Sequence, residues 1–428
     1  MVVDVPMKSP FKAEVPKEEY LMVILSLIIV AGGAWMMGGF YSFGSYWMGV
    51  GGWFVGGLAL GLLIRDERLR IHNPALKPVW LLWIVFLVWL VISFANPSYR
   101  PVDLPEGKSF VTSNPIDWLP SVVSRLDSGP AMFQLSGSLV LAWSIIAIIR
   151  TQRAARALLL GMVINAFILS LLGAWFTVVS EPNILGVFKA VNSSFFASFT
   201  YHNHWVAYSI FHLFLATGLM SYYNHLNKKW GGVSHLLVFL GVVCFFLWLS
   251  LLLVESRLGL LMAGGYVCFL LLYLVRRKIR ILWKNPIRSL FVVIGVVACA
   301  WMLFHIVAPQ LLPTTQRISD AVEVVAHEGS DVDSFRFDHS PKNAAELIQD
   351  KPLLGWGWGS YRIALRLYSP QYMGDRFATF AHNDWSQFVT ELGVLGCLLL
   401  LFPLVHMSIN LTSQDTIARF SRMAIVLL

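Results

Sequence analysis

Charged residues are scarce in this chain of 428 residues. They make up 13% of the sequence, whereas an ordinary soluble domain holds roughly 25%. Hydrophobic residues reach 57%, above the roughly 45–50% of soluble domains, and the mean hydropathy is +0.66. This balance excludes an ordinary soluble enzyme, a disordered chain, a collagen and a nucleic-acid-binding domain.

Cysteine and the common phosphate- and metal-binding motifs are also scarce. The sequence has no glycine-rich phosphate loop ending in Lys-Ser/Thr, and no paired-Asp motif of the kind that holds a divalent metal in many membrane glycosyltransferases. Acidic and basic residues are nearly missing from the centres of the apolar runs, which leaves His212 and His305 as titratable candidates and argues against an ion-driven transporter. The cysteines all fall in apolar runs, which favours buried free thiols: Cys244, Cys268, Cys299 and Cys397.

Long apolar runs are what the chain has in abundance. A membrane-spanning helix needs about 20 mostly apolar residues, and the sequence predicts an all-α fold, a polytopic transmembrane bundle of about 10–12 helices with one long, partly helical outer loop. An eleventh run opens at residue 421, and because Leu428 falls inside it we expect the chain to be a piece of a longer one. The ten complete runs are 20–39, 47–64, 78–95, 131–149, 156–179, 204–223, 235–254, 258–275, 289–309 and 391–412.

The positions of Lys and Arg predict the orientation of this bundle. With the N-terminus in the cytoplasm, 20 of the 32 Lys and Arg residues fall in cytoplasmic segments, five in short outer segments and seven in one long outer loop. Cytoplasmic loops of membrane proteins carry such an excess of positive charge. We therefore interpret the net charge of +8 as a topology signal rather than a nucleic-acid footprint.

The long outer loop divides the chain into three predicted parts. Residues 1–309 hold the first nine transmembrane helices with short loops, 310–390 form the large outer loop that carries the site, and 391–428 hold C-terminal transmembrane helices. Two further outer segments, 96–130 and 180–203, are shorter. Structureless loops as long as the 310–390 segment are uncommon and usually functional.

The 310–390 loop has internal order. Ser340 and Pro341 suit the N-cap and the first position of a helix, and Lys351-Pro352 would end that helix. Its apolar stripe would be formed by Ala344, Ala345, Leu347 and Ile348.

A turn with two indoles follows, Gly355-Trp356-Gly357-Trp358-Gly359. Trp356 and Trp358 are weak candidates for stacking on sugar rings. Trp is equally normal at a membrane interface, so both interpretations of this turn stay open.

The strongest candidate for chemistry is Ala381-His382-Asn383-Asp384, directly before Glu391-Leu392-Gly393-Val394-Leu395-Gly396. Asn383 suits the cap of the helix that returns to the membrane, and Asp384 suits its first turn. The positive end of that helix would keep the His382 imidazole neutral, as a general base for a sugar hydroxyl requires. The alternative is a polar residue at a helix start that hydrogen-bonds the loop.

Arginine provides the candidates for binding a phosphate. Arg257 follows Glu255-Ser256 in a tight outer turn between two spanning runs, and a charge at membrane depth is a functional candidate. The guanidinium group binds phosphate oxygens two at a time. A snorkelling residue paired with Glu255 is the alternative. Arg336, which precedes the loop helix, is a further candidate.

The stretch Tyr201-His202-Asn203-His204 contains two histidines that suggest a metal pair. Side chains two residues apart on a helix point apart, and no acidic ligand lies nearby. The sequence therefore predicts no metal, and Asn203 fits better as a hydrogen-bonding residue that lines a cavity.

Four of these pieces resemble the O-antigen ligase and O-antigen polymerase superfamily, over about residues 203–396. Asn203-His204-Trp205-Val206-Ala207 resembles the family's Asn-rich start of a spanning helix, and Ser256-Arg257 resembles its outer-face Arg turn. The stretch from Arg336 to Gly357 resembles its loop helix and Gly turn. His382-Asn383 with Gly393-Val394-Leu395-Gly396 resembles the His-Asn…Gly-x-x-Gly signature associated with the ligases. The last two pieces are the more specific ones.

The resemblance implies a metal-independent glycosyltransferase without a cofactor, on the periplasmic face of the bacterial inner membrane. By analogy, His382 would activate the acceptor hydroxyl, and Arg257 and Arg336 would bind the donor diphosphate. The family often has another Arg before the Asn-rich element, where this chain has Lys189. The supporting residues would be Asn203, Asn383, Asp384 and Glu391.

The partners implied are a glycan on undecaprenyl diphosphate as donor, a lipid-A-core or growing glycan as acceptor, and membrane lipids, with no nucleic acid. The leading interpretation is a ligase that moves a finished glycan to lipid-A core. The nearest alternative is a polymerase of O-antigen or exopolysaccharide, and transfer to protein hydroxyls is a third variant. A transporter would belong to a different class, and His382 would then be dispensable.

Overall fold

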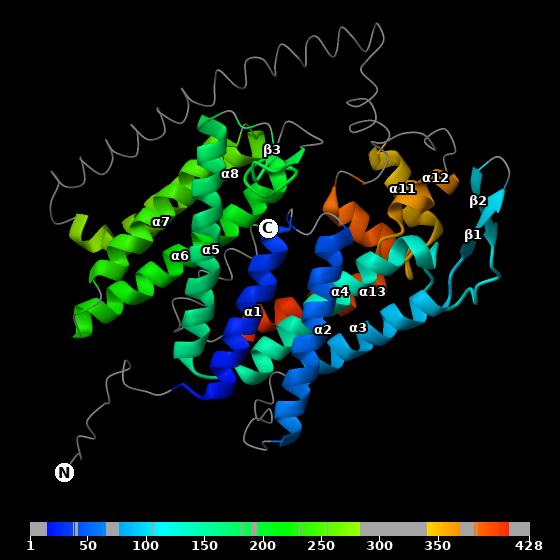
Figure 1. Ribbon diagram of the computed structural model, residues 1–428, viewed down its shortest axis with the longest axis horizontal. Helices are drawn as coiled ribbons and strands as arrows, with labels where there is room; N and C mark the ends of the chain where they lie inside the picture. Colours follow the sequence, from blue (N-terminus) through cyan, green and yellow to red (C-terminus); the bar gives the residue numbers. More distant parts are fainter. Residues whose placement is uncertain are drawn as a thin grey trace, which may run out of the picture. The chain divides into compact units, whose positions relative to one another are not determined.

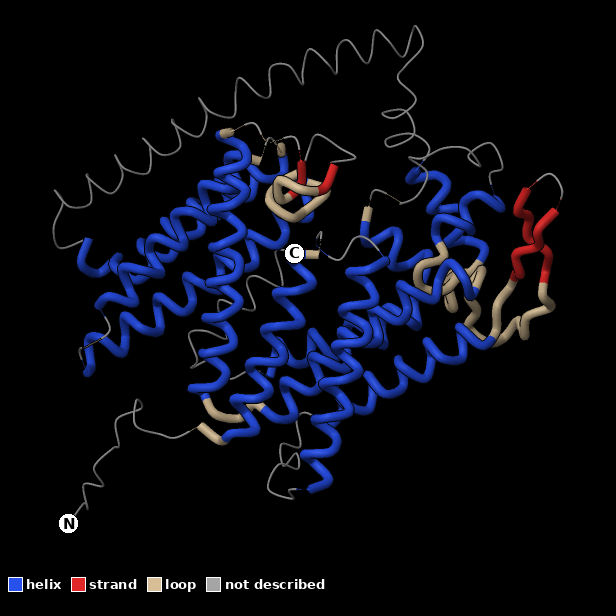
Figure 2. Tube along the Cα trace, viewed as in Figure 1, coloured by secondary structure: helices blue, strands red, loops and turns tan. Residues whose placement is uncertain are grey.

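The computed structural model describes residues 15–36, 38, 42–65, 77–104, 107–179, 181, 183–189, 195–230, 232, 234–254, 256–282, 340–368, 381 and 383–410. In these ranges the protein consists of helices and two short hairpins (Figure 2). The helices are α1 (Lys17–Trp35), α2 (Ser42–Arg65), α3 (Lys77–Ala95), α4 (Arg125–Ile148), α5 (Gln152–Val178), α6 (His202–Trp230), α7 (Ser234–Leu253), α8 (Arg257–Leu282), α11 (Ser340–Asp350), α12 (Tyr361–Tyr368) and α13 (Asp384–Asn410).

Seven helices within the described ranges are long and apolar enough to cross a membrane, namely α1, α2, α4, α5, α6, α7 and α13. Helices α3 and α8 add shorter apolar stretches, Trp80–Ala95 and Leu258–Leu271. Nine of the ten predicted runs fall on these nine helices, while the run 289–309 and the start at 421 lie outside the described residues. The predicted fold class, a polytopic helical membrane protein, is confirmed.

The two hairpins were not predicted. Strands β1 (Tyr99–Leu104) and β2 (Gly107–Thr112) pair antiparallel, as do β3 (Asn183–Ile184) and β4 (Phe188–Lys189). Both lie in the predicted outer segments 96–130 and 180–203. Neither segment has an apolar run long enough to form a spanning helix, and two chain stretches joined by a short turn satisfy their backbone groups by pairing with each other.

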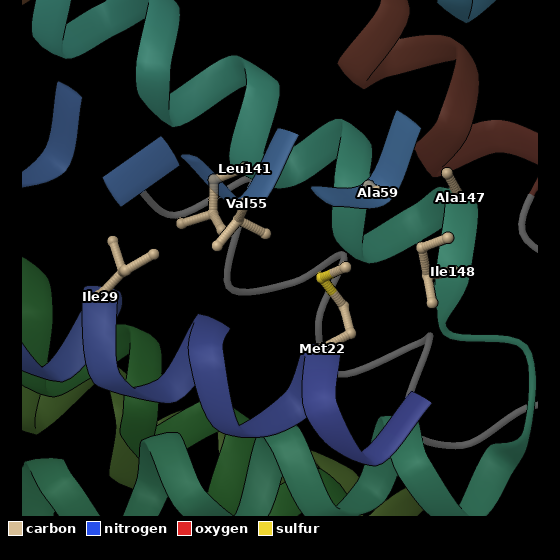
Figure 3. Packing of buried hydrophobic residues seen from close by; sticks show 7 residues of the cluster. All are labelled: Met22, Ile29, Val55, Ala59, Leu141, Ala147 and Ile148. Carbon is tan, nitrogen blue, oxygen red and sulfur yellow. The ribbon is translucent and has the colours of Figure 1, made fainter. Parts of the chain in front are cut away.

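The described residues form two compact units. The first runs up to Asn165 and resumes at Asn343, and the second begins at Ala166. In the first unit, α1, α2 and α4 pack together. Helices α2 and α4 approach closely because Gly52 has no side chain, and a Cβ there would lie 2.8 Å from the Gly137 Cα. Figure 3 shows the core between the three helices, formed by Met22, Ile29, Val55, Ala59, Leu141, Ala147 and Ile148.

A second core of the first unit holds α13, the helix that carries the strongest candidate motif. Helix α13 packs along α3 (Figure 1). Phe86 and Leu90 of α3 cluster with Leu392 and Leu400 of α13, and Val122 joins them from the segment before α4. Helix α3 therefore fixes the helix on which the candidate site is built.

In the second unit, α6 packs against α7 and α8, and polar side chains bond across these helices. Trp205 Nε1 donates to Ser250 Oγ over 3.2 Å, and the hydroxyls of Thr217 and Tyr266 lie 2.6 Å apart. The buried His212 has its Nδ1 2.7 Å from the Tyr208 carbonyl. Cys244, Cys268 and Cys397 are free thiols in helices, whereas Cys299 and His305 lie outside the described residues.

Candidate functional site

Helix α11 confirms the helix predicted in the long loop. It starts at Ser340 and ends at Asp350, directly before Lys351. Ala344 and Leu347 are buried, as expected of residues three apart on one helix face. Ala345 is exposed and Ile348 is half-buried. Of the predicted apolar stripe, Ala345 therefore lies off the buried face, because its position is turned by about 100° from that of Ala344 on a helix.

The turn Gly355–Gly359 joins α13 at a kink. Gly393 interrupts α13 with a φ of 63° and a ψ of 177°, which frees backbone groups that the turn then binds. Two backbone hydrogen bonds run from the turn to α13, Trp356 N–H to Thr390 C=O (2.9 Å) and Gly357 N–H to Glu391 C=O (2.7 Å). Two more run from α13 to the residues just before the turn, Val394 N–H to Pro352 C=O (2.9 Å) and Leu395 N–H to Leu353 C=O (3.2 Å).

Two glycines make this close contact possible. A Cβ on Gly355 would lie 2.5 Å from the Glu391 carbonyl oxygen, and a Cβ on Gly393 would lie 2.6 Å from the Gly355 nitrogen. Both residues also have positive φ values, 69° and 63°, which L side chains rarely adopt. The glycines of the two signature pieces therefore form one structural joint.

The carboxylate of Glu391 lies inside this joint and is 2% exposed. Its Oε2 accepts a hydrogen bond from Gly359 N–H (2.8 Å), and its Oε1 accepts from Tyr361 N–H (3.1 Å) and from Gln387 Nε2 (3.2 Å). Tyr361 is the first residue of α12, so the carboxylate lies at the positive end of that helix. Glu391 thus ties the turn and α12 to α13.

Further bonds tie the residues on either side of the turn to α4 and to the segments that flank the β1–β2 hairpin. Ser360 Oγ accepts from Val123 N–H (3.0 Å) and lies 2.9 Å from Ser128 Oγ. Lys351 Nζ donates to Ser121 Oγ (3.2 Å) and to Ser98 Oγ (3.4 Å). Burial lowers the pKa of the Lys351 ammonium, because desolvation disfavours its charged form.

The two indoles of the turn have different surroundings. Trp356 is 5% exposed, donates from Nε1 to the Leu347 carbonyl (2.9 Å) and carries Lys351 Nζ at 4.4 Å from its ring centroid. This burial argues against sugar stacking by Trp356. Trp358 is half-buried, with its ring stacked on Phe388 at 5.4 Å.

The start of α13 is capped as predicted. Asn383 Oδ1 accepts from Ser386 N–H (3.2 Å), and the Asn383 carbonyl accepts from Gln387 N–H (3.0 Å). Asp384 is the first helical residue and is exposed. His382 lies outside the described residues, although Ala381 and Asn383 on either side of it are described.

In the second unit, two of the predicted site pieces meet. Ser256 Oγ donates to Asn203 Oδ1 over 2.7 Å and accepts from Gly259 N–H (3.2 Å), so that Ser256 caps α8. Asn203 Nδ2 donates to the Tyr201 hydroxyl (2.9 Å). Arg257 is the first residue of α8, and its side chain lies outside the described residues. The structure therefore joins the Asn-rich piece to the Ser-Arg turn.

The remaining candidates are placed as follows. Lys189 lies on β4 and is exposed, and Arg336 lies outside the described residues. The rings of His202 and His204 contact the Tyr201 ring, with centroid distances of 4.6 and 5.3 Å. In the described part of the chain, no group of three or more His, Cys, Asp and Glu residues is placed to hold a metal ion.

Sequence reasoning missed the polar residues that hold the joint together. Gln387 precedes Glu391 by four residues, the spacing at which helix side chains meet, so its contact with Glu391 could have been predicted. The serine partners of Lys351 lie 230 and 253 residues away in the sequence. The partners of Ser360 lie 232 and 237 residues away, and no local pattern indicates any of them.

Together, these helices, the capped start of α13 and the joint define a polytopic helical membrane protein with an elaborated loop beside a spanning helix. Residues 242–401 match the family model described as O-antigen ligase. Over these residues the match confirms the resemblance to the O-antigen ligase superfamily found in the sequence, and it supports a ligase- or polymerase-type function in general terms. No significant match was found among curated proteins or among solved structures.

Proposed function

We propose that this protein is a glycosyltransferase of the ligase type, which moves a glycan from undecaprenyl diphosphate to a hydroxyl of lipid-A core on the periplasmic face of the inner membrane. The match to the O-antigen ligase family over residues 242–401 carries this proposal. The matched range contains the joint, and it ends beyond the His-Asn…Gly-x-x-Gly signature that favours a ligase over a polymerase.

His382 is the general base in this proposal. The acceptor oxygen attacks the anomeric carbon of the donor, the bond from that carbon to the diphosphate oxygen breaks, and the hydroxyl proton moves to the imidazole. Undecaprenyl diphosphate leaves. Support comes from the capped helix start beside His382, with Asn383 as the cap and Asp384 in the first turn, because the positive end of a helix favours a neutral imidazole.

Positive side chains bind the donor diphosphate in the proposed mechanism. Arg257 and Arg336 contribute guanidinium groups, which suit phosphate oxygens, and Lys189 contributes a point charge. Asn203 supports Arg257 through its hydrogen bond to Ser256, the residue directly before the arginine. Glu391 supports the periplasmic loop from within the joint. A lipid diphosphate is a good leaving group, so the protein has to supply position, charge and a base.

The test is a glycan gel of the source organism carrying His382→Ala in the full-length gene, with lipopolysaccharide and secreted polysaccharide examined together. We expect long chains to vanish from lipid-A core and to accumulate on the lipid carrier, while folded protein persists in the membrane. Core that retains a single repeat unit, or loss of exopolysaccharide alone, would instead identify a polymerase. An unchanged gel would remove the general-base role and favour a transporter.

A further inference from the structure

Gln387 contacts both neighbours of His382. Its side-chain Oε1 accepts a hydrogen bond from Ala381 N–H (3.3 Å), and its backbone N–H donates to the Asn383 carbonyl (3.0 Å). Ala381 is 4% exposed, so its N–H has lost most of its access to water. The Gln387 side chain therefore holds the backbone directly before His382, whereas the bond to Asn383 is the ordinary backbone bond of the first helical turn.

The other end of the Gln387 amide is bound to the buried carboxylate of Glu391, where Nε2 donates to Oε1 over 3.2 Å. The two partners fix which way the amide points, because a carboxylate only accepts hydrogen bonds and a backbone N–H only donates one. The amide has no second orientation that satisfies both. Glu391 in turn is held by Gly359 and Tyr361.

These bonds form one continuous connection from the Gly355–Gly359 turn, through Glu391 and Gln387, to the backbone beside His382. Buried networks of this kind rigidify their members when every donor and acceptor is paired. A displacement of about 1 Å at a reacting group can cost about 100-fold in rate. Holding the backbone directly before a general base therefore affects the reaction rate as well as the stability of the fold.

We propose that Gln387 is a positioning residue for glycosyl transfer, which fixes the backbone directly before His382 and is itself oriented by Glu391. This inference rests on the proposed role of His382 as the base. The connection acts on the acceptor-activating step, so it affects turnover rather than binding of the lipid-linked donor.

The test uses the full chain in lipid nanodiscs, with an undecaprenyl-diphosphate-linked glycan as donor and lipid-A core as acceptor. Gln387→Met keeps the side-chain length and removes both polar bonds. Gln349→Met is the matched control, because Gln349 is an exposed glutamine of α11. We expect kcat to fall by about 10- to 100-fold in Gln387→Met, with the KM of the donor near that of the control. The thermal midpoint should fall as well, because the buried Ala381 N–H loses its acceptor.

Hydrogen–deuterium exchange of the peptide that contains Ala381 provides a readout independent of activity. Exchange at the Ala381 amide should accelerate in Gln387→Met and stay unchanged in Gln349→Met. Gln387→Glu is the second variant: it keeps an oxygen for Ala381 N–H but presents a carboxylate to Glu391, and we expect it to lose kcat as well.

Three results would overturn the inference: an unchanged kcat in Gln387→Met, unaltered exchange at Ala381, or a loss of donor affinity in parallel with kcat, which indicates a purely structural role. The His382→Ala variant, measured alongside, separates this inference from the proposed function. A fully active His382→Ala protein refutes the base. An inactive His382→Ala protein combined with a fully active Gln387→Met protein refutes the positioning role alone.

Discussion

The two regions that carry the predicted site residues are built in different ways. In the first unit, the joint between the Gly355–Gly359 turn and α13 is made by backbone groups, two glycines with positive φ and one buried carboxylate. In the second unit, the corner where α6 meets α8 is made by side chains, with Ser256 bonded to Asn203 and to the first turn of α8.

This difference predicts different tolerance to substitution. A joint in which backbone lies directly against backbone has no room for an added atom, so even one methyl group forces the chain apart. A side-chain hydrogen bond at a helix end contributes about 1 kcal/mol, and the helix packing around it survives its loss. Substitutions in the joint should therefore destabilise the protein more than substitutions at the corner between α6 and α8.

The largest effect is expected from Gly393→Ala in α13. The new Cβ would lie 2.6 Å from the Gly355 nitrogen, at a residue with φ of 63°. The left-handed conformation and the overpacking together should cost about 2–5 kcal/mol. The expected outcome is a lower thermal midpoint for the purified protein and loss of long-chain glycan in cells.

Gly57→Ala in α2 is the control for this experiment, because a Cβ there would meet nothing within 4 Å. We expect its thermal midpoint to equal or exceed that of the wild type, since Ala is the better helix former. If Gly393→Ala were as stable and active as Gly57→Ala, the joint would not be the rigid element that the comparison assumes.

A smaller effect is expected from Glu391→Gln, which keeps the shape of the side chain. One oxygen remains to accept a hydrogen bond, but the new NH₂ group faces a donor, either a backbone N–H or the Gln387 amide. An unpaired buried donor costs about 1–3 kcal/mol. We expect a thermal midpoint between those of wild type and Gly393→Ala, measured in the same detergent.

Glu346→Gln provides the comparison, because Glu346 is an exposed glutamate of α11 and should tolerate the same change without a measurable shift. An equal shift in both variants would mean that the buried bonds of Glu391 contribute no more than surface charge does. The difference between the two regions would then rest on the glycines alone.

The sequence predicted the parts of the protein that follow from local patterns. The apolar runs indicated nine of the described helices. Asn383 correctly marked the start of α13, and the Lys351-Pro352 pair correctly marked the end of α11. The joint could not be predicted, because Gly355 and Gly393 are each ordinary turn or helix glycines until the chain brings them together. The same holds for Ser256 and Asn203, whose contact depends on how α6 and α8 pack.

The smallest effect is expected at the corner of the second unit, from Ser256→Ala. The change removes the bond to Asn203 and the cap on Gly259 N–H, which together should cost about 1–2 kcal/mol. A double-mutant cycle with Asn203→Ala isolates the shared bond, and we expect a coupling of about 0.5–1.5 kcal/mol from thermal or chemical unfolding of the purified protein. Additive effects would show that the two residues act separately. A loss as large as that of Gly393→Ala would show that the corner is as intolerant as the joint, and the contrast between side-chain and backbone construction would fail.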